Sequence, residues 1–238
     1  AIIMTIQVSK ARLAFWTAVL KACTMTFMFM AHTSAIAIFM MCLAVYLLRK
    51  YKWGFLPCTV LLICGLGVYQ SYISIAITLM LLGMITDLLN DKDVWRTLKK
   101  GILCIIVLLV TVGIYMWLCH VIYPNIDNET YGGIGNMGDI AISEMPRLAG
   151  RCYKRFLEFF IWKPFPFISK IAQVMNICTC VLAVGLGIYL IIRKKIYKKV
   201  WNCILLCVIA TFVPMAAAFV YFMAPEVDYS MLMLYAYV

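Results

Sequence analysis

The sequence predicts an all-α protein: a polytopic bundle of about seven to eight transmembrane helices with one large outer loop that carries an amphipathic interfacial helix. The 238 residues are 66% hydrophobic with a mean hydropathy of +0.98, whereas a soluble domain is about 45–50% apolar. Only 13% of the residues are charged, and they cluster between apolar runs of roughly 20 residues, the length that crosses a bilayer core. We therefore expect a single transmembrane domain over residues 1–238.

Eight apolar runs follow one another along the chain. They cover residues 13–30, 35–48, 53–68, 73–89, 101–122, 171–192, 200–221 and the stretch after residue 228. Lys21 lies near the middle of the first run; it is either a functional residue or a side chain that snorkels to the surface, because a charge within a membrane is costly. The chain begins at Ala1 and ends at Val238 within an apolar run, so we expect a fragment of a longer protein.

Basic clusters indicate the orientation of the passes, because Lys and Arg concentrate on the cytoplasmic side of membrane proteins. Four clusters hold 14 of the 21 basic residues and lie at residues 10–12, 49–52, 92–100 and 193–199. With these clusters inside, the passes alternate without a break. The polar segments that then fall outside are residue 32 and residues 69–72, 123–170 and 226–228.

Composition also argues against other kinds of partner. The net charge of +11 comes mostly from residues that flank apolar runs, which is a topology signal, so we expect no nucleic-acid partner. Nine of the 11 cysteines fall within expected helices and pack as small hydrophobes, whereas Cys119 and Cys152, near the outer face, can be free or paired. With only His32 and His120 available, we expect no metal and no cofactor.

The segment 123–170 is the one long polar stretch, and it holds five of the ten acidic residues. Its glycine-rich part, residues 131–138, lacks the Lys-Ser/Thr of a P-loop and the preceding strand of a dinucleotide fold. It is either a turn that approaches a ligand closely or a plain surface turn. We expect the outer-face chemistry in this segment because polar substrates need polar groups.

A basic amphipathic helix should follow the glycine-rich part, with Ser143 as N-cap and Pro146 in the first turn. Its apolar side carries Met145, Leu148, Cys152, Phe156 and Phe159. Its opposite side carries Arg147, Arg151, Lys154, Arg155 and Glu158. Such a helix lies in the membrane interface. Its arginines either attract anionic head groups or hold a lipid phosphate with their guanidinium groups.

A second polar cluster, Tyr69-Gln70-Ser71-Tyr72, stands at the outer end of a tight helical hairpin. Tyrosine and glutamine side chains can hydrogen-bond sugar hydroxyls. The same residues can instead anchor the hairpin at the membrane surface, where aromatic rings gather.

The order of these features resembles the bacterial O-antigen-type glucosyltransferases of the GtrII group, which are multi-spanning enzymes of the GT-C class. The resemblance covers most of the chain. It rests on residues 31–48, the hairpin Gly67-Val68-Tyr69-Gln70-Ser71-Tyr72-Ile73-Ser74, the basic turn after Leu89 and the loop opening at Tyr131-Gly132. It implies a GT-C-like helical bundle in a bacterial cell membrane, with its active face outward.

The resemblance also implies a reaction. Enzymes of this group move a sugar, here expected to be glucose, from a polyprenyl-phosphate carrier among the membrane lipids to a glycan acceptor. A carboxylate takes the acceptor's proton, for which we expect Asp139 or Glu144. The lipid phosphate is expected to bind Arg147, Arg151 and Lys154. Sugar and acceptor contacts are expected from Tyr69, Gln70, Tyr72 and Tyr131.

The chain departs from the GT-C pattern in its first outer loop, where such enzymes place a catalytic carboxylate. Residues 31–34 contain none, so we expect the usual base to lie upstream of Ala1, with Glu226 and Asp228 as weaker substitutes. The alternatives are a transporter or flippase for a lipid-linked glycan and a membrane subunit without catalytic chemistry. A transporter should carry polar residues at mid-membrane on several helices, and only Lys21 clearly does so.

A cysteine placed at Asn136 tests the orientation in a variant whose native cysteines are replaced. Because residues 123–170 are expected outside, it should react with a membrane-impermeant maleimide in intact cells. A cysteine replacing Lys195, within a basic cluster, is the control and should label only in inverted vesicles. The opposite labelling pattern would contradict the predicted topology.

Overall fold

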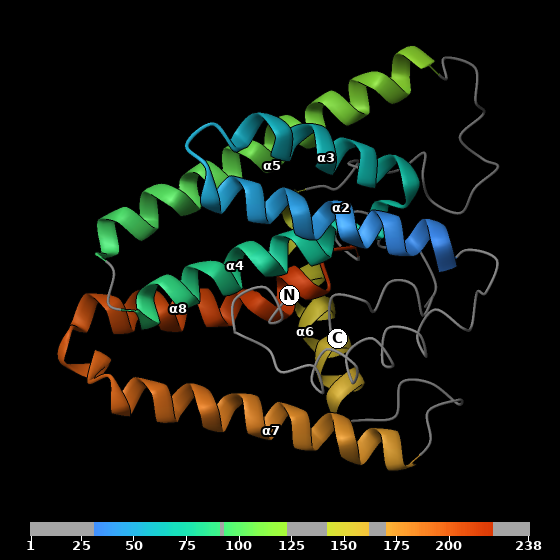
Figure 1. Cartoon of the computed structure of the whole chain (residues 1–238). Helices are drawn as coiled ribbons and strands as arrows, with labels where there is room; N and C mark the ends of the chain where they lie inside the picture. The colour runs from blue at the N-terminus through green and yellow to red at the C-terminus, as the bar shows by residue number, and fades with distance from the viewer. Residues whose placement is uncertain (1–30, 91–92, 123–141, 162–169, 221–238) are drawn as a thin grey trace.

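The computed structural model describes residues 31–90, 93–122, 142–161 and 170–220 (Figure 1). Within these ranges it contains helices and no strand, which confirms the all-α prediction. The α-helices are α2 (Ala31–Lys50), α3 (Phe55–Val68), α4 (Ile73–Leu89), α5 (Val94–Ile122), α6 (Met145–Phe160), α7 (Lys170–Arg193) and α8 (Val200–Ala217). The 3-10 turns are η3 (Gln70–Tyr72), η4 (Ile142–Glu144) and η5 (Ile196–Lys198).

Five of these helices are long and apolar enough to cross a membrane: α2, α4 with η3, α5, α7 and α8. The helix α3 has 14 residues, which is about 21 Å at 1.5 Å per residue, against a hydrocarbon core of about 30 Å. The terminal runs at residues 13–30 and after 228 lie outside the described ranges. The structure thus supports five of the seven to eight passes predicted.

Successive long helices run in opposite directions, so their ends gather at two levels (Figure 1). One level, which we call the basic end, holds the last turns of α2, α4 and α7 and the first turns of α3, α5 and α8. Arg49 and Lys50 close α2, and Arg193 closes α7. The opposite level, the loop end, holds η3 and the last turn of α5. This segregation matches the alternation of passes expected from the basic clusters.

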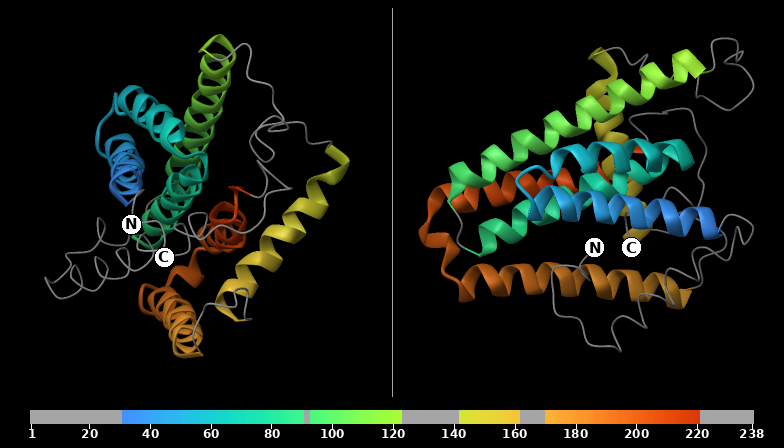
Figure 2. Two further views of the ribbon diagram at one scale, coloured as in Figure 1. Left: turned by 90° about the vertical axis from the view of Figure 1, so that its right-hand side faces the viewer. Right: turned by 45° about the horizontal axis from the view of Figure 1, so that its top comes forward.

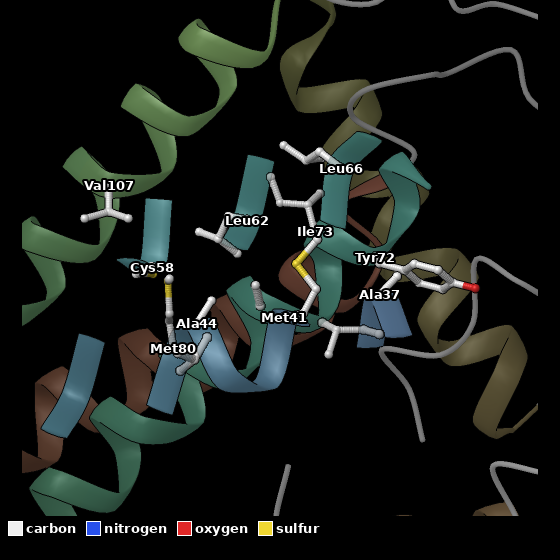
Figure 3. Packing of buried hydrophobic residues seen from close by; sticks show 13 residues of the cluster. Ala37, Met41, Ala44, Cys58, Leu62, Leu66, Tyr72, Ile73, Met80 and Val107 are labelled. Atoms are coloured by element: carbon white, nitrogen blue, oxygen red, sulfur yellow. The ribbon is translucent and has the colours of Figure 1, made fainter. Parts of the chain in front are cut away.

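The main core lies between α2, α3, α4 and α5. Figure 3 shows the side chains that meet there. They include Ala37, Met41 and Ala44 from α2; Cys58, Leu62 and Leu66 from α3; Ile73 and Met80 from α4; and Val107 from α5. Small residues let the backbones approach: a Cβ on Gly65 would stand 2.6 Å from the Met41 methyl carbon. Close packing of this kind, rather than water exclusion, holds helices together in lipid.

The turn between α2 and α3 depends on one glycine. A Cβ added to Gly54 would lie 2.0 Å from the Leu47 carbonyl oxygen, so the last turn of α2 rests directly on this residue. Its φ of −62° is ordinary for any amino acid, and the requirement for glycine is therefore purely steric.

One buried carboxylate joins three helices at the basic end. Asp87 of α4 is 2% exposed; one of its oxygens accepts from Arg49 Nη2 of α2 at 3.0 Å and the other accepts from Lys100 Nζ of α5 at 2.8 Å. Gly83, one turn earlier on α4, makes room for the arginine, because a Cβ there would stand 1.5 Å from Arg49 Nη1. We call these three charged residues the ion triad.

The helices α7 and α8 continue the bundle beside α4. Leu206 and Ile209 of α8 pack on Leu88 of α4 in a second, smaller core. The helix α7 is tied near its ends: Lys194, just beyond it, donates to the Asn90 side chain at 2.7 Å, and Gln173 donates to the Ile161 carbonyl at 2.7 Å. Its central segment stays on the outside of the described bundle, as expected for a surface that faces lipid.

Replacing Gly54 by alanine should destabilise the fold, because the added methyl group would overlap backbone atoms of α2 that cannot rotate away. We expect a loss of about 1–3 kcal/mol, the usual effect of overpacking, read as a fall in the thermal midpoint in detergent. Gly67→Ala is the matched control on α3, where a Cβ meets no atom within 4 Å. That change should be neutral or stabilise by about 0.5–1 kcal/mol; equal losses in both variants would contradict the steric argument.

Candidate functional site

The expected amphipathic helix is present as α6, and it lies across the other helices rather than along them (Figure 2). It begins at Met145, with Glu144 at the N-cap position and no side-chain hydrogen bond to cap it. The expectation of Ser143 as N-cap was wrong, because residues 142–144 wind into the 3-10 turn η4 and carry Ser143 inside that turn. Pro146 lies in the first turn, as predicted.

The apolar side of α6 docks on the last turns of α8. Leu148 and Cys152 are buried. The Cys152 thiol donates to the Ala218 carbonyl at 3.4 Å, and the Tyr153 hydroxyl donates to the Thr211 carbonyl. Pro214 interrupts the α8 ladder near this point, because it has no N–H to give. The position of α6 is therefore set by carbonyl groups at the loop end of a membrane-crossing helix.

The question of a bridge between Cys119 and Cys152 is answered, since both are free thiols. Burial raises the pKa of the Cys152 thiol to about 12 and outweighs the nearby Arg151 guanidinium, which acts in the opposite direction. A thiol held neutral and covered in this way is a packing group rather than a nucleophile.

The helix α6 also carries a cationic stripe, which we define as Arg147, Arg151, Lys154, Arg155 and Glu158. Arg147 and Lys154 lie on the side opposite Cys152, whereas Arg155, three residues after Cys152, lies near the docked side. Arg147 and Lys154 are exposed, whereas Arg151 is half-buried. Glu158 accepts from Arg155 at 3.1 Å and lies 3.9 Å from the Lys154 ammonium. Four cations and one carboxylate give the stripe a net charge of +3, so it can bind an anion of more than one charge.

Of the two expected catalytic carboxylates, Glu144 is exposed just before α6. It stands at the positive end of the helix dipole, three residues before Arg147 and seven before Arg151. Helical spacing places a residue and those three and seven positions later on one face. Glu144 is thus adjacent to the cationic stripe. Asp139 lies outside the described residues, as does Tyr131.

The second expected cluster forms the 3-10 turn η3 between α3 and α4. Gln70 Nε2 donates to the Tyr115 hydroxyl of α5 at 3.0 Å. The Tyr72 side chain is 1% exposed and hydrogen-bonds the Ser34 side chain of α2. Its ring also lies 5.2 Å, centroid to centroid, from the ring of Tyr69. Tyr69 and Gln70 are half-buried and keep part of their surface exposed, whereas Tyr72 packs beneath them.

The two clusters rest on different helices: η3 lies at the loop end, and α6 crosses the bundle near the last turn of α8 (Figure 1). The turn η3 packs on α2, α3 and α4, and α6 packs on α7 and α8. The structure therefore places the predicted site residues in two separate groups. One group is Glu144 with the cationic stripe, and the other is Tyr69, Gln70 and Tyr72.

Two kinds of residue escaped the sequence reasoning. Ser71 and Ser74 are buried next to Tyr72, and their hydroxyl groups have no hydrogen-bond partner; only their place in the polar hairpin could have pointed to them. Asp87 of the ion triad is the second kind, because no role follows for it from the sequence. A lone carboxylate at the end of an apolar run was its one signal. Among the described residues, no group of three or more His, Cys, Asp or Glu side chains could hold a metal ion.

Alkylation of Cys152 should be slow in the folded protein. With a pKa of about 12, only about 0.1% of this thiol is ionised at pH 9, and the thiolate is the form that reacts. Gly150→Cys is the matched control on α6, because residue 150 is exposed and a Cβ there meets no atom within 4 Å. We expect peptide mass spectrometry to find the control modified rapidly and Cys152 only after unfolding. Equal rates would show that α6 does not dock on α8.

The model of one family, described as Glucosyl transferase GtrII, matches residues 11–238. No curated protein and no solved structure matches the chain. The match covers nearly the whole chain, and it agrees with the helical membrane fold and with the resemblance found in the sequence. The chain therefore belongs to the GtrII glucosyltransferase family and is a membrane glycosyltransferase, with a sugar donor and an acceptor as its substrates.

Proposed function

We propose that this protein moves glucose from a polyprenyl-phosphate carrier to a cell-surface glycan, on the outer side of a bacterial membrane. The cationic stripe of α6 is the observation that supports this most directly. It carries a net charge of +3 and packs against the membrane-crossing helices α7 and α8, so we place it at the membrane surface. Membrane proteins are depleted of arginine on their outer side, so a row of cations there needs a partner with negative charge.

The phosphate of the donor would be held by Arg147, Arg151 and Lys154. A guanidinium can engage two phosphate oxygens at once. In the reaction the acceptor hydroxyl oxygen forms a bond to the anomeric carbon, and the bond from that carbon to the phosphate oxygen breaks. The electron pair leaves with the polyprenyl phosphate. Cations placed at the phosphate stabilise the charge that develops there, which is commonly the largest contribution to such a rate.

A carboxylate must take the proton that the acceptor hydroxyl loses. Glu144 is the described candidate, because it is exposed and adjacent to Arg147. Asp139 is the second candidate, five residues earlier in the chain. The base works only within hydrogen-bond reach of the acceptor hydroxyl, so we propose that the acceptor binds beside the N-terminus of α6.

Sugar recognition is proposed for Tyr69 and Gln70, which keep exposed surface at the loop end, and for Tyr131. Tyr72 would act by fixing these residues, since its own side chain is buried and bonded to Ser34. In this arrangement the phosphate meets α6 and the glycan extends toward η3.

A transporter fits the described helices less well. The threonines along them are occupied locally: Thr59, Thr78, Thr111, Thr179 and Thr211 each donate to the carbonyl four residues earlier. Hydroxyls satisfied in this way offer little lining for a polar path at mid-membrane. The ion triad is polar, but it lies at the basic end.

Removal of the stripe's charge tests the proposal. Arg147→Gln and Arg151→Gln should each lower transfer of glucose from a polyprenyl-phosphate donor by about tenfold to a hundredfold, the effect of losing a hydrogen bond to a charged group. Arg155→Gln removes one charge from the same helix, but from a side chain already bonded to Glu158; it should keep most activity. Normal transfer by both Arg147→Gln and Arg151→Gln in correctly inserted protein would refute the phosphate role.

A further inference from the structure

We propose that the ion triad at the basic end is a binding site for the phosphate of an anionic lipid head group. This site is separate from the transferase site, which lies at the loop end. Arg49 and Lys100 come from different helices and are 38 and 13 residues from Asp87 in the chain. One buried carboxylate holds both of them in place, so their positions are fixed before a ligand arrives.

Charge is the first argument for a ligand. Among the residues that the structure describes, two cations pair with this one carboxylate, and the three groups together carry a net charge of +1. A phosphodiester carries one negative charge and accepts several hydrogen bonds, so it matches this surplus. Basic pockets between membrane helices on the cytoplasmic side are known to bind anionic head groups.

Access is the second argument. The side chain of Asp87 is 3% exposed, but those of Arg49 and Lys100 are 28% and 37% exposed. The carboxylate therefore occupies the inner side of both cations while their outer sides stay open. The guanidinium lies over Gly83, which has no side chain to cover it. An arginine offers five N–H groups and a lysine three, and Asp87 uses only part of them.

The level of the site in the membrane favours a lipid over a soluble anion. Trp53 follows Arg49 by four residues, and Trp95 precedes Lys100 by five. These two tryptophans are 69% and 70% exposed. Exposed tryptophans mark the head-group level of a bilayer. The triad thus lies between two interfacial anchors, where lipid phosphates are concentrated.

The experiment compares the full chain in nanodiscs of phosphatidylcholine with and without a minor fraction of phosphatidylglycerol. We expect phosphatidylglycerol to raise the thermal midpoint by about 3–6 °C, which corresponds to a ligand at roughly ten times its Kd. Native mass spectrometry should show retained phosphatidylglycerol, reduced about tenfold or more in Arg49→Gln and Lys100→Gln.

Lys50→Gln is the matched control. It removes one neighbouring cation that contacts the exposed hydroxyl of Tyr46 and not Asp87, so lipid binding should stay within about twofold of the wild type. An equal loss of phosphatidylglycerol binding in this variant would show that the lipid is held by diffuse charge attraction and not by the ion triad. If the triad only holds the helices together, all triad variants will melt earlier while the difference between the two lipids stays unchanged, and the proposal fails.

Two further measurements use the wild-type protein alone: its preference between the two lipids and its response to inorganic phosphate. If the Gln variants do not fold, the wild type alone must still prefer phosphatidylglycerol, and absence of that preference would overturn the proposal. Inorganic phosphate added to phosphatidylcholine nanodiscs distinguishes the source of the anion. Stabilisation by phosphate equal to that by phosphatidylglycerol would show a soluble-anion site instead of a head-group site.

Discussion

A hydrocarbon layer accepts charged side chains at its two surfaces and almost nowhere between them, and this constraint organises the whole protein. Within the membrane-crossing segments, of which the one in α7 begins at Gln173, the cations lie at the basic end, in the last turns of α2 and α7 and the first turns of α5. Asp87 is the one carboxylate buried among the described residues, and it is tolerated because two cations reach it from neighbouring helices. Removing both cations would leave this buried charge uncompensated, which would be strongly destabilising.

The same constraint explains which parts of the fold were predictable from the sequence. The run 73–89 coincides with α4 because that helix is apolar over nearly its whole length. The run 101–122 gives only part of α5, which starts at Val94. Its first two turns, with Arg96, Lys99 and Lys100, are helical but not apolar, so hydropathy does not detect them.

The burial of individual polar side chains depends on how the helices pack, which hydrophobic periodicity does not predict. Whether a carboxylate at the end of an apolar run is solvated or buried depends on the register of three helices, and the partners of Asp87 come from distant parts of the chain. The role of Tyr72 changed for the same reason. The motif Tyr-Gln-Ser-Tyr indicated a polar surface, but the 3-10 turn η3 rotates Tyr72 inward onto α2 and leaves Tyr69 and Gln70 partly exposed.

The contact between α6 and α8 shows how a cationic helix is held away from the basic end, although Lys and Arg usually concentrate on the cytoplasmic side. Cys152 donates to the carbonyl of Ala218, just beyond α8, and Tyr153 donates to the carbonyl of Thr211 in the second half of α8. These two contacts orient α6. Because those two residues face α8, Arg147, Arg151 and Lys154 are turned to the other side of α6. The docking contact thus determines the direction of the stripe, and a lipid phosphate approaching from the membrane surface would meet cations whose orientation is already fixed.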